Sequence, residues 1–178
     1  MGVLDIKPVK YEEDRMLILD QTQLPGEMVY LEMKTKEDVW DAVYKLKVRG
    51  APAIGVAAGY GLYICTRDIC AKDYNDFYRQ FTEIKDYLAS SRPTAVNLFW
   101  ALDRIEGRVR EFEYAARDHS ARDLNKSEGF KENTERIDTW ENTQSMIKKA
   151  ILEEAEKIRT EDESACRAMG EHGLTLLK

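Results

Sequence analysis

The chain has 178 residues, of which 43% are hydrophobic and 34% are charged, and its formal net charge is −6. This length is enough for one well-packed core or for one domain with an appendage, and the acidic balance disfavours nucleic acid as the principal partner. The sequence has no apolar run of about 18 residues and no apolar signal core at its start, so we expect neither a membrane partner nor secretion.

The first part of the chain predicts an antiparallel sheet. Arg15–Leu19 and Met28–Met33 are rich in strand-forming residues, and the sequence LPGE lies between them. Pro25 and Gly26 suit the two central positions of a type II turn, in which glycine takes a positive φ. We expect a further strand near Val9–Tyr11.

A helical period begins after the sheet. Thr35 and Asp38 have the spacing of a capping box, which predicts the start of a helix at this point. Val39, Val43 and Leu46 then form one apolar stripe.

Three further helices follow in the chain. Pro52 suits the first turn of a second helix, which we expect to extend to about Ile69. Third and fourth helices are predicted by apolar residues at helical spacing. These residues are Tyr74, Phe77, Phe81, Ile84 and Leu88 in the third helix, and Leu98, Leu102, Ile105, Val109 and Phe112 in the fourth.

The period fades in residues 113–143, where large apolar residues are scattered among charges. This composition indicates an exposed polar insertion that is partly disordered. Periodicity resumes with Ile147, Ile151 and Ile158. We expect a last helix to start at the sequence TEDE, where Thr160 and Glu163 again match a capping box.

These elements predict an α+β fold, with a small antiparallel β-sheet followed by a helical bundle. Residues 1–34 form the sheet subregion, and residues 35–178 form the helical bundle of the same domain, including the polar insertion. The sequence contains neither the GxGxxG motif of dinucleotide-binding folds nor a P-loop motif.

The sequence VRGAPAIGVAAGYGL, Val48–Leu62, is rich in glycine and alanine and has one charged residue, Arg49. Two interpretations of this stretch are open. Its small side chains allow close helix–helix packing, which would offset the low helix propensity of glycine. Alternatively, RGAP leads into a helix N-terminus, where free N–H groups and the helix dipole favour an anion and an arginine suits phosphate.

Arg92, in the sequence SSRPT, is a second candidate ligand for an anion. It precedes Pro93, which predicts extended backbone at the entry to the fourth helix. The alternative is an ordinary solvated loop arginine. The residues alone do not decide whether Arg49 and Arg92 converge.

The cysteines and histidines are few. Cys65, Cys70 and Cys166 include no CxxC pair and are accompanied by His119 and His172. We therefore expect no structural zinc site, and reduced thiols indicate a cytoplasmic location. The cysteines are expected to be small buried thiols rather than nucleophiles. His172 is expected to pack against or cap a helix, and His119 to be solvated.

Several of these motifs together resemble a known family. VRGAPAIGVAAGYGL, SRPTAVNLFWALDR, EDESACRAMGEHG and the opening LDQTQLPGEMVYLE are similar, in order and spacing, to the N-terminal half of the methylthioribose-1-phosphate isomerases. The resemblance covers most of residues 9–112 and 144–178, and the insertion is longer than the usual connection in that family. It implies that this is the N-terminal domain of a larger protein with a Rossmann-like C-terminal domain.

The resemblance also implies an activity. Members of the family convert 5-methylthioribose 1-phosphate to 5-methylthioribulose 1-phosphate in methionine salvage, usually as homodimers, without a metal or organic cofactor. The positions that match the family's substrate-binding residues are Arg49, Gly50, Ala51 and Arg92. The catalytic cysteine and aspartate of the family fall beyond Lys178, so this chain alone is expected to be inactive.

Two alternatives share the fold. The ribose-1,5-bisphosphate isomerases also handle a sugar phosphate. The regulatory subunits of the translation-initiation guanine-nucleotide exchange factor instead act as binding and assembly modules. The arginines in RGAP and SRPT favour a sugar-phosphate site over a purely structural role.

Overall fold

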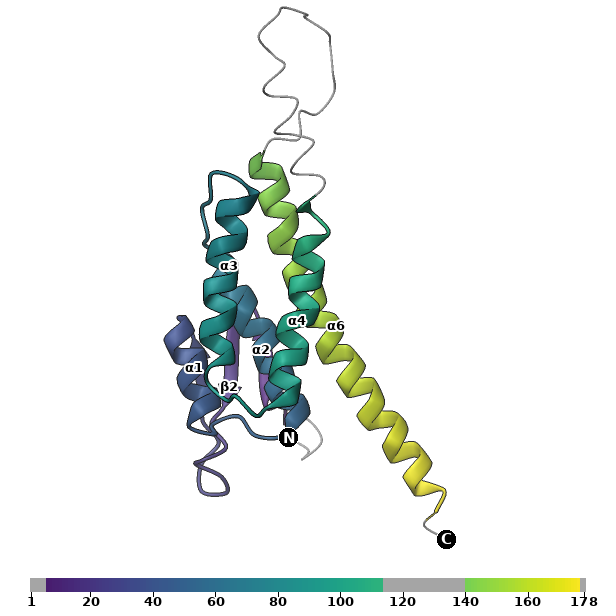
Figure 1. The fold of residues 1–178 in the computed structure, drawn as a ribbon. Helices are drawn as coiled ribbons and strands as arrows, with labels where there is room; N and C mark the ends of the chain where they lie inside the picture. The colour runs from purple at the N-terminus through teal and green to yellow at the C-terminus, as the bar shows by residue number, and fades with distance from the viewer. Residues whose placement is uncertain (1–5, 114–139, 177–178) are drawn as a thin grey trace, which may run out of the picture.

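The fold was analysed in a computed structural model that describes residues 6–113 and 140–176. His119 and almost all of the predicted insertion lie outside these residues. The described elements form a three-stranded sheet and a bundle of helices (Figure 1), which confirms the predicted α+β class. They are β1 (Val9–Glu12), β2 (Arg15–Leu19), β3 (Tyr30–Met33), α1 (Lys36–Tyr44), α2 (Ala51–Thr66), α3 (Tyr74–Ala89), α4 (Val96–Arg110) and α6 (Trp140–Leu174).

The sheet is antiparallel throughout, with the strand order β1-β2-β3. Met16 of β2 pairs with Tyr11 of β1 on one side and with Met33 of β3 on the other. Met16 and Ile18 are both fully buried and belong to the same core as the helices. The alternation along β2 therefore directs one face of the sheet onto the bundle, as its strand pattern predicts.

The connection between β2 and β3 differs from the predicted type II turn. Gly50 is the only described glycine with a positive φ, so Gly26 does not adopt the conformation that this turn requires. The connection spans residues 20–29 and is closed at its base by the Asp20 N–H, which donates to the Val29 carbonyl over 2.9 Å. The Asp20 carboxylate accepts from both the N–H and the hydroxyl of Thr22. The fold of this loop is therefore set at Asp20 rather than at Pro25.

The capping box of α1 is confirmed. The Asp38 N–H donates to the Thr35 hydroxyl over 3.1 Å, and the Thr35 N–H donates to the Asp38 carboxylate over 3.0 Å. Leu46, in contrast, does not continue the apolar stripe of the helix. It lies beyond the C-cap with a φ of 58° and is 41% exposed, because the chain leaves the helix in a left-handed turn at this residue.

The centre of the bundle is α2, which is buried on nearly all sides. A Cβ on Gly61 would lie 2.5 Å from Cγ1 of Val39 in α1, and a Cβ on Gly59 would lie 3.4 Å from Ala155 in α6. The glycines therefore let α1 and α6 approach the backbone of α2. Close packing is the correct interpretation for the middle of this small-residue stretch.

The last helix, α6, is continuous across the sequence TEDE, so the start predicted there is wrong. The Thr160 hydroxyl donates to the carbonyls of Glu156 and Lys157, as in a helix interior, and does not cap a new helix. Arg159 and Glu163 form an ion pair across the same turn. The helix also begins at Trp140, inside the expected insertion, and its C-terminal part extends past the bundle (Figure 1).

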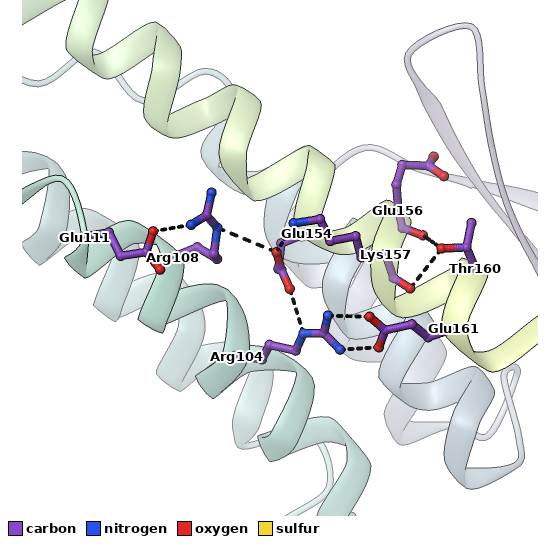
Figure 2. Close-up of polar contacts among 8 residues, drawn as sticks. All are labelled: Arg104, Arg108, Glu111, Glu154, Glu156, Lys157, Thr160 and Glu161. Carbon is purple, nitrogen blue, oxygen red and sulfur yellow. Dashed lines mark hydrogen bonds and ion pairs between the residues drawn. The ribbon is translucent and has the colours of Figure 1, made fainter. Parts of the chain in front are cut away.

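A buried carboxylate joins α6 to α4 (Figure 2). The Glu154 side chain is 6% exposed and accepts from Nε of Arg104 over 2.6 Å, while Lys157 and Arg108 lie within 4 Å of it. Arg104 also forms two bonds to Glu161. Burial acts to raise the pKa of Glu154, but the bonds from Arg104 and Lys157 outweigh it and lower the pKa. The network holds α6 on α4 through charge-assisted bonds.

We predict that Gly61→Ala lowers the free energy of unfolding by about 1–3 kcal/mol, because the added methyl group would overlap Val39. Gly107→Ala in α4 is the matched control. No atom lies within 4 Å of a Cβ at that position, so this change should raise stability by about 0.5–1 kcal/mol. Urea unfolding of both variants checks the prediction, and an unchanged midpoint for Gly61→Ala would contradict it.

We predict that Glu154→Gln lowers the free energy of unfolding at pH 7 by about 1–3 kcal/mol, because Arg104 and Arg108 lose the charge they face. Since the folded-state pKa is lowered, this stabilisation is present above the ordinary value of about 4.5 and is lost as the pH falls further. The difference in the free energy of unfolding between the variant and the wild type should therefore become smaller in acid. The neighbouring exposed Glu153→Gln should have little effect at any pH.

Candidate functional site

The candidate site lies at the N-terminal ends of α2 and α4. The N-cap residues there, Gly50 and Ala95, make no side-chain capping bond. In contrast, Thr35 caps α1 and Asp73 caps α3 through their side chains. The first turns of α2 and α4 therefore present backbone N–H groups that no N-cap side chain satisfies.

These two helices lie side by side and run in the same direction. A Cβ on Gly55 would lie 3.3 Å from the Asn97 carbonyl oxygen, and one on Gly59 would lie 3.6 Å from Cδ1 of Ile105. Since both partners advance along the chain together, the helices are parallel and their N-termini lie at the same end of the bundle (Figure 1). Their dipoles therefore add at this end.

The first turn of α2 is open to solvent. Gly50 has a φ of 90°, a conformation that strongly favours glycine. Gly50, Ala51 and Pro52 are all exposed, so no large side chain covers the helix end. The Ile54 N–H donates to the Gly50 carbonyl over 3.0 Å. Because proline has no N–H, an anion would meet the N–H groups of Ala51 and Ala53 here.

Arg49 is exposed and is held by two backbone carbonyls. Its Nε donates to the Leu46 oxygen over 3.1 Å, and its Nη2 donates to the Gln21 oxygen over 3.4 Å. Arg92 is half-buried in the connection from α3 to α4, where its carbonyl accepts from the Ala95 N–H over 3.0 Å. Both predicted arginines thus flank the adjacent helix ends.

Arg49 and Arg92 also differ in charge environment from most other arginines. Within residues 6–113 and 140–176, only these two and Arg167 have no carboxylate within 4 Å. The arginines that do have such a partner are Arg15, Arg67, Arg79, Arg104, Arg108, Arg110 and Arg159. The positive charge at the two helix ends is therefore available to an anion.

The thiols lie elsewhere and differ from one another. Cys65 is half-buried near the C-terminal end of α2, and burial raises its pKa to about 12. Cys70 and Cys166 are exposed, so the expectation that they are buried is wrong. Cys166 is exposed because the C-terminal part of α6 leaves the bundle. His172 is also exposed, with Nδ1 2.7 Å from the Ala168 carbonyl oxygen.

Metal and membrane sites were also considered. Among the described residues, no group of three or more His, Cys, Asp or Glu side chains is arranged to hold a metal ion. None of the described helices combines the length and apolarity needed to cross a membrane.

Two contributors to the site were missed by sequence reasoning. The carbonyls that hold Arg49 are those of Gln21, in the connection between two predicted strands, and of Leu46, in a segment interpreted as helix. No local signal marks a backbone carbonyl as an arginine acceptor, and Gln21 lies 28 residues from Arg49 in the chain.

The described residues form an α+β domain in which two parallel helix N-termini lie at one end of the bundle. Residues 47–178 match the Initiation factor 2 subunit family, and the chain belongs to this family.

Relatives in this family include named sugar-phosphate isomerases. The 5-deoxyribose 1-phosphate isomerase of Petrotoga mobilis is 41% identical over 177 residues, which are 98% of this chain and 43% of the relative. The methylthioribose-1-phosphate isomerase of Parabacteroides distasonis is 45% identical over 167 residues, which are 94% of this chain and 42% of the relative. The chain thus spans about two fifths of the length of these relatives.

Two solved structures share the fold. The 5-methylthioribose 1-phosphate isomerase from Pyrococcus horikoshii matches with a TM-score of 0.66 and 32% identity, over 87% of this chain and 36% of that one. The delta subunit of translation initiation factor eIF-2B from A. fulgidus matches with a TM-score of 0.67 and 28% identity, over 89% of this chain and 38% of that one.

We predict that Arg49→Ala and Arg92→Ala each weaken binding of inorganic phosphate by about 1.5–3 kcal/mol, because each would remove a charge-assisted contact to the anion. Isothermal titration calorimetry measures the effect. Arg79→Ala, at an exposed arginine already paired with Asp76 and Glu83, is the control and should leave affinity unchanged. Unaltered affinity in both site variants would remove the phosphate role.

Proposed function

We propose that this chain is the N-terminal, phosphate-binding domain of an aldose–ketose isomerase that converts 5-methylthioribose 1-phosphate to 5-methylthioribulose 1-phosphate in methionine salvage. The observation that carries the proposal is a pair of arginines, without carboxylate partners among the described residues, at the adjacent N-termini of α2 and α4. In this proposal Arg49, Gly50, Ala51 and Arg92 bind the phosphate and the neighbouring sugar atoms. The names of the relatives support the reaction class.

The proposed role of these residues is to hold the substrate rather than to react with it. The anomeric carbon carries the phosphate, so the sugar ring does not open as that of a free aldose does. Fixing the phosphate against two helix ends and two guanidiniums would orient C1 and C2 for hydrogen transfer. Binding energy from a non-reacting group is thereby used to position the reacting carbons.

The chemical step is assigned in this proposal to the part of the relatives that this chain does not span. Cys65 does not suit acid–base chemistry near neutral pH, because burial raises its pKa to about 12. By resemblance, a cysteine and an aspartate of a Rossmann-like C-terminal domain would act as the acid–base pair. A cytoplasmic homodimer, with residues 1–34 and 35–178 forming one domain, is part of the same proposal.

A regulatory subunit of a translation-initiation exchange factor is the second candidate. The match to the delta subunit of eIF-2B, with a TM-score of 0.67, favours it.

The identity of the sugar is a separate question. The relatives are named for two different sugars, 5-deoxyribose 1-phosphate and methylthioribose 1-phosphate, which differ at C5. Ribose 1,5-bisphosphate, which carries a second phosphate at C5, is a third possible sugar phosphate.

We predict that the full-length protein isomerises 5-methylthioribose 1-phosphate, whereas residues 1–178 alone bind it without turnover. Turnover assays with this sugar, 5-deoxyribose 1-phosphate and ribose 1,5-bisphosphate give kcat/KM for each and rank the substrates. Turnover by residues 1–178 alone would contradict the assignment of chemistry to the part of the relatives that this chain does not span. No binding of any of the three sugars, with recovery of an initiation factor in a pull-down, would favour the regulatory subunit instead.

A further inference from the structure

Asp20 is a buried carboxylate that the proposed function does not use. It is 7% exposed, and within residues 6–113 and 140–176 it forms no ion pair with a lysine, arginine or histidine. Its Oδ1 accepts from the Thr22 N–H over 3.0 Å and from the Thr22 hydroxyl over 2.6 Å. Burying a carboxylate is costly unless hydrogen bonds offset the loss of water, so these two bonds account for its placement.

The same residue closes the loop of residues 20–29. The Asp20 N–H donates to the Val29 carbonyl over 2.9 Å, and the Asp20 carbonyl accepts from the Gln23 N–H over 3.2 Å. The adjacent Gln21 N–H donates to the Lys47 carbonyl over 2.8 Å. The loop is therefore ordered at Asp20 and attached to the segment that leaves α1.

This attachment brings the Gln21 carbonyl to Arg49. The Arg49 guanidinium is held at one edge by this oxygen and by that of Leu46, at 3.4 and 3.1 Å. Leu46 has a φ of 58°, a conformation that a bulky residue rarely adopts. Both acceptors are neutral, so they orient the guanidinium while leaving its charge and its Nη1 for an anion.

We propose that Asp20 is a positioning residue of the phosphate site, which acts by holding the Gln21 carbonyl toward Arg49. The inference rests on the proposed function, since it needs Arg49 to bind the substrate phosphate. Without the two bonds to Thr22, the loop keeps only its backbone bonds, so the Gln21 carbonyl is held less firmly and one of the two supports of Arg49 is weakened. The guanidinium then samples other orientations, and substrate binding weakens.

The test measures KM and kcat of the full-length protein with 5-methylthioribose 1-phosphate. Asp20→Ala should raise KM about fivefold to tenfold, the effect of one lost hydrogen-bonded support, with a smaller change in kcat. Asp20→Asn keeps an acceptor oxygen for Thr22, so it should restore KM to within about twofold of the wild-type value. Asp73→Ala is the matched control, because Asp73 caps α3 by accepting the Asp76 N–H over 2.8 Å. It should reduce stability and leave KM unchanged.

A double-mutant cycle separates positioning from a general loss of structure. In an Arg49→Ala background, Asp20→Ala should raise KM no further, because the residue through which it acts is already gone. If Asp20→Ala fails to fold, Thr22→Val supplies the same cycle. It removes only the hydroxyl donor and should raise KM about twofold to threefold, while Thr22→Ser should not.

The outcomes are distinguishable. An equal rise in KM from Asp20→Ala in both backgrounds would overturn the positioning role, as would an unchanged KM in the Asp20 variant when Arg49→Ala raises it. If Arg49→Ala itself leaves KM unchanged, the proposed phosphate role fails, and the inference about Asp20 fails with it.

Discussion

The close approach of neighbouring helices to the backbone of α2 is the constraint on which the rest of the structure depends. A Cβ on Gly61 would overlap Val39 of α1, and a Cβ on Gly59 would already be in van der Waals contact with Ala155 of α6. Glycine is a poor helix former, so the helix depends on this packing for its stability. Because α1, α4 and α6 are all packed against one central helix, a change in that helix would displace each of them.

The same packing creates the candidate site. Gly55 brings the start of α2 against Asn97 at the start of α4, so two helix N-termini lie at one end of the bundle. Elsewhere on α4, Arg104 and Arg108 face Glu154 and hold α6 in place. Arg104 and Arg108 thus join two helices through a carboxylate, whereas Arg49 and Arg92, which have no carboxylate partner among the described residues, flank the helix ends.

Local signals predicted much of the fold. The strands Val9–Glu12 and Arg15–Leu19, the capping box of α1 and the apolar faces of α3 and α4 are all confirmed. Each depends on neighbouring residues, whose spacing can be recognised in the sequence.

The helix start predicted at Thr160 shows where local spacing misleads. Thr160 and Glu163 have the spacing of a capping box, but the Thr160 hydroxyl instead donates to carbonyls of the turn before it, because the helix has already begun at Trp140.

The sequence by itself determined the order of the strands and helices, the small-residue composition of α2 and the position of an arginine at the entry to α2 and to α4. Only the tertiary structure decided that α2 and α4 are parallel, so that Arg49 and Arg92 lie at the same end of the bundle. It also decided that the carbonyl of Gln21, 28 residues away in the chain, holds Arg49. The physical reason is range: propensity and capping act within a few residues, whereas the α2–α4 and Gln21–Arg49 contacts join segments that meet only once the core has packed.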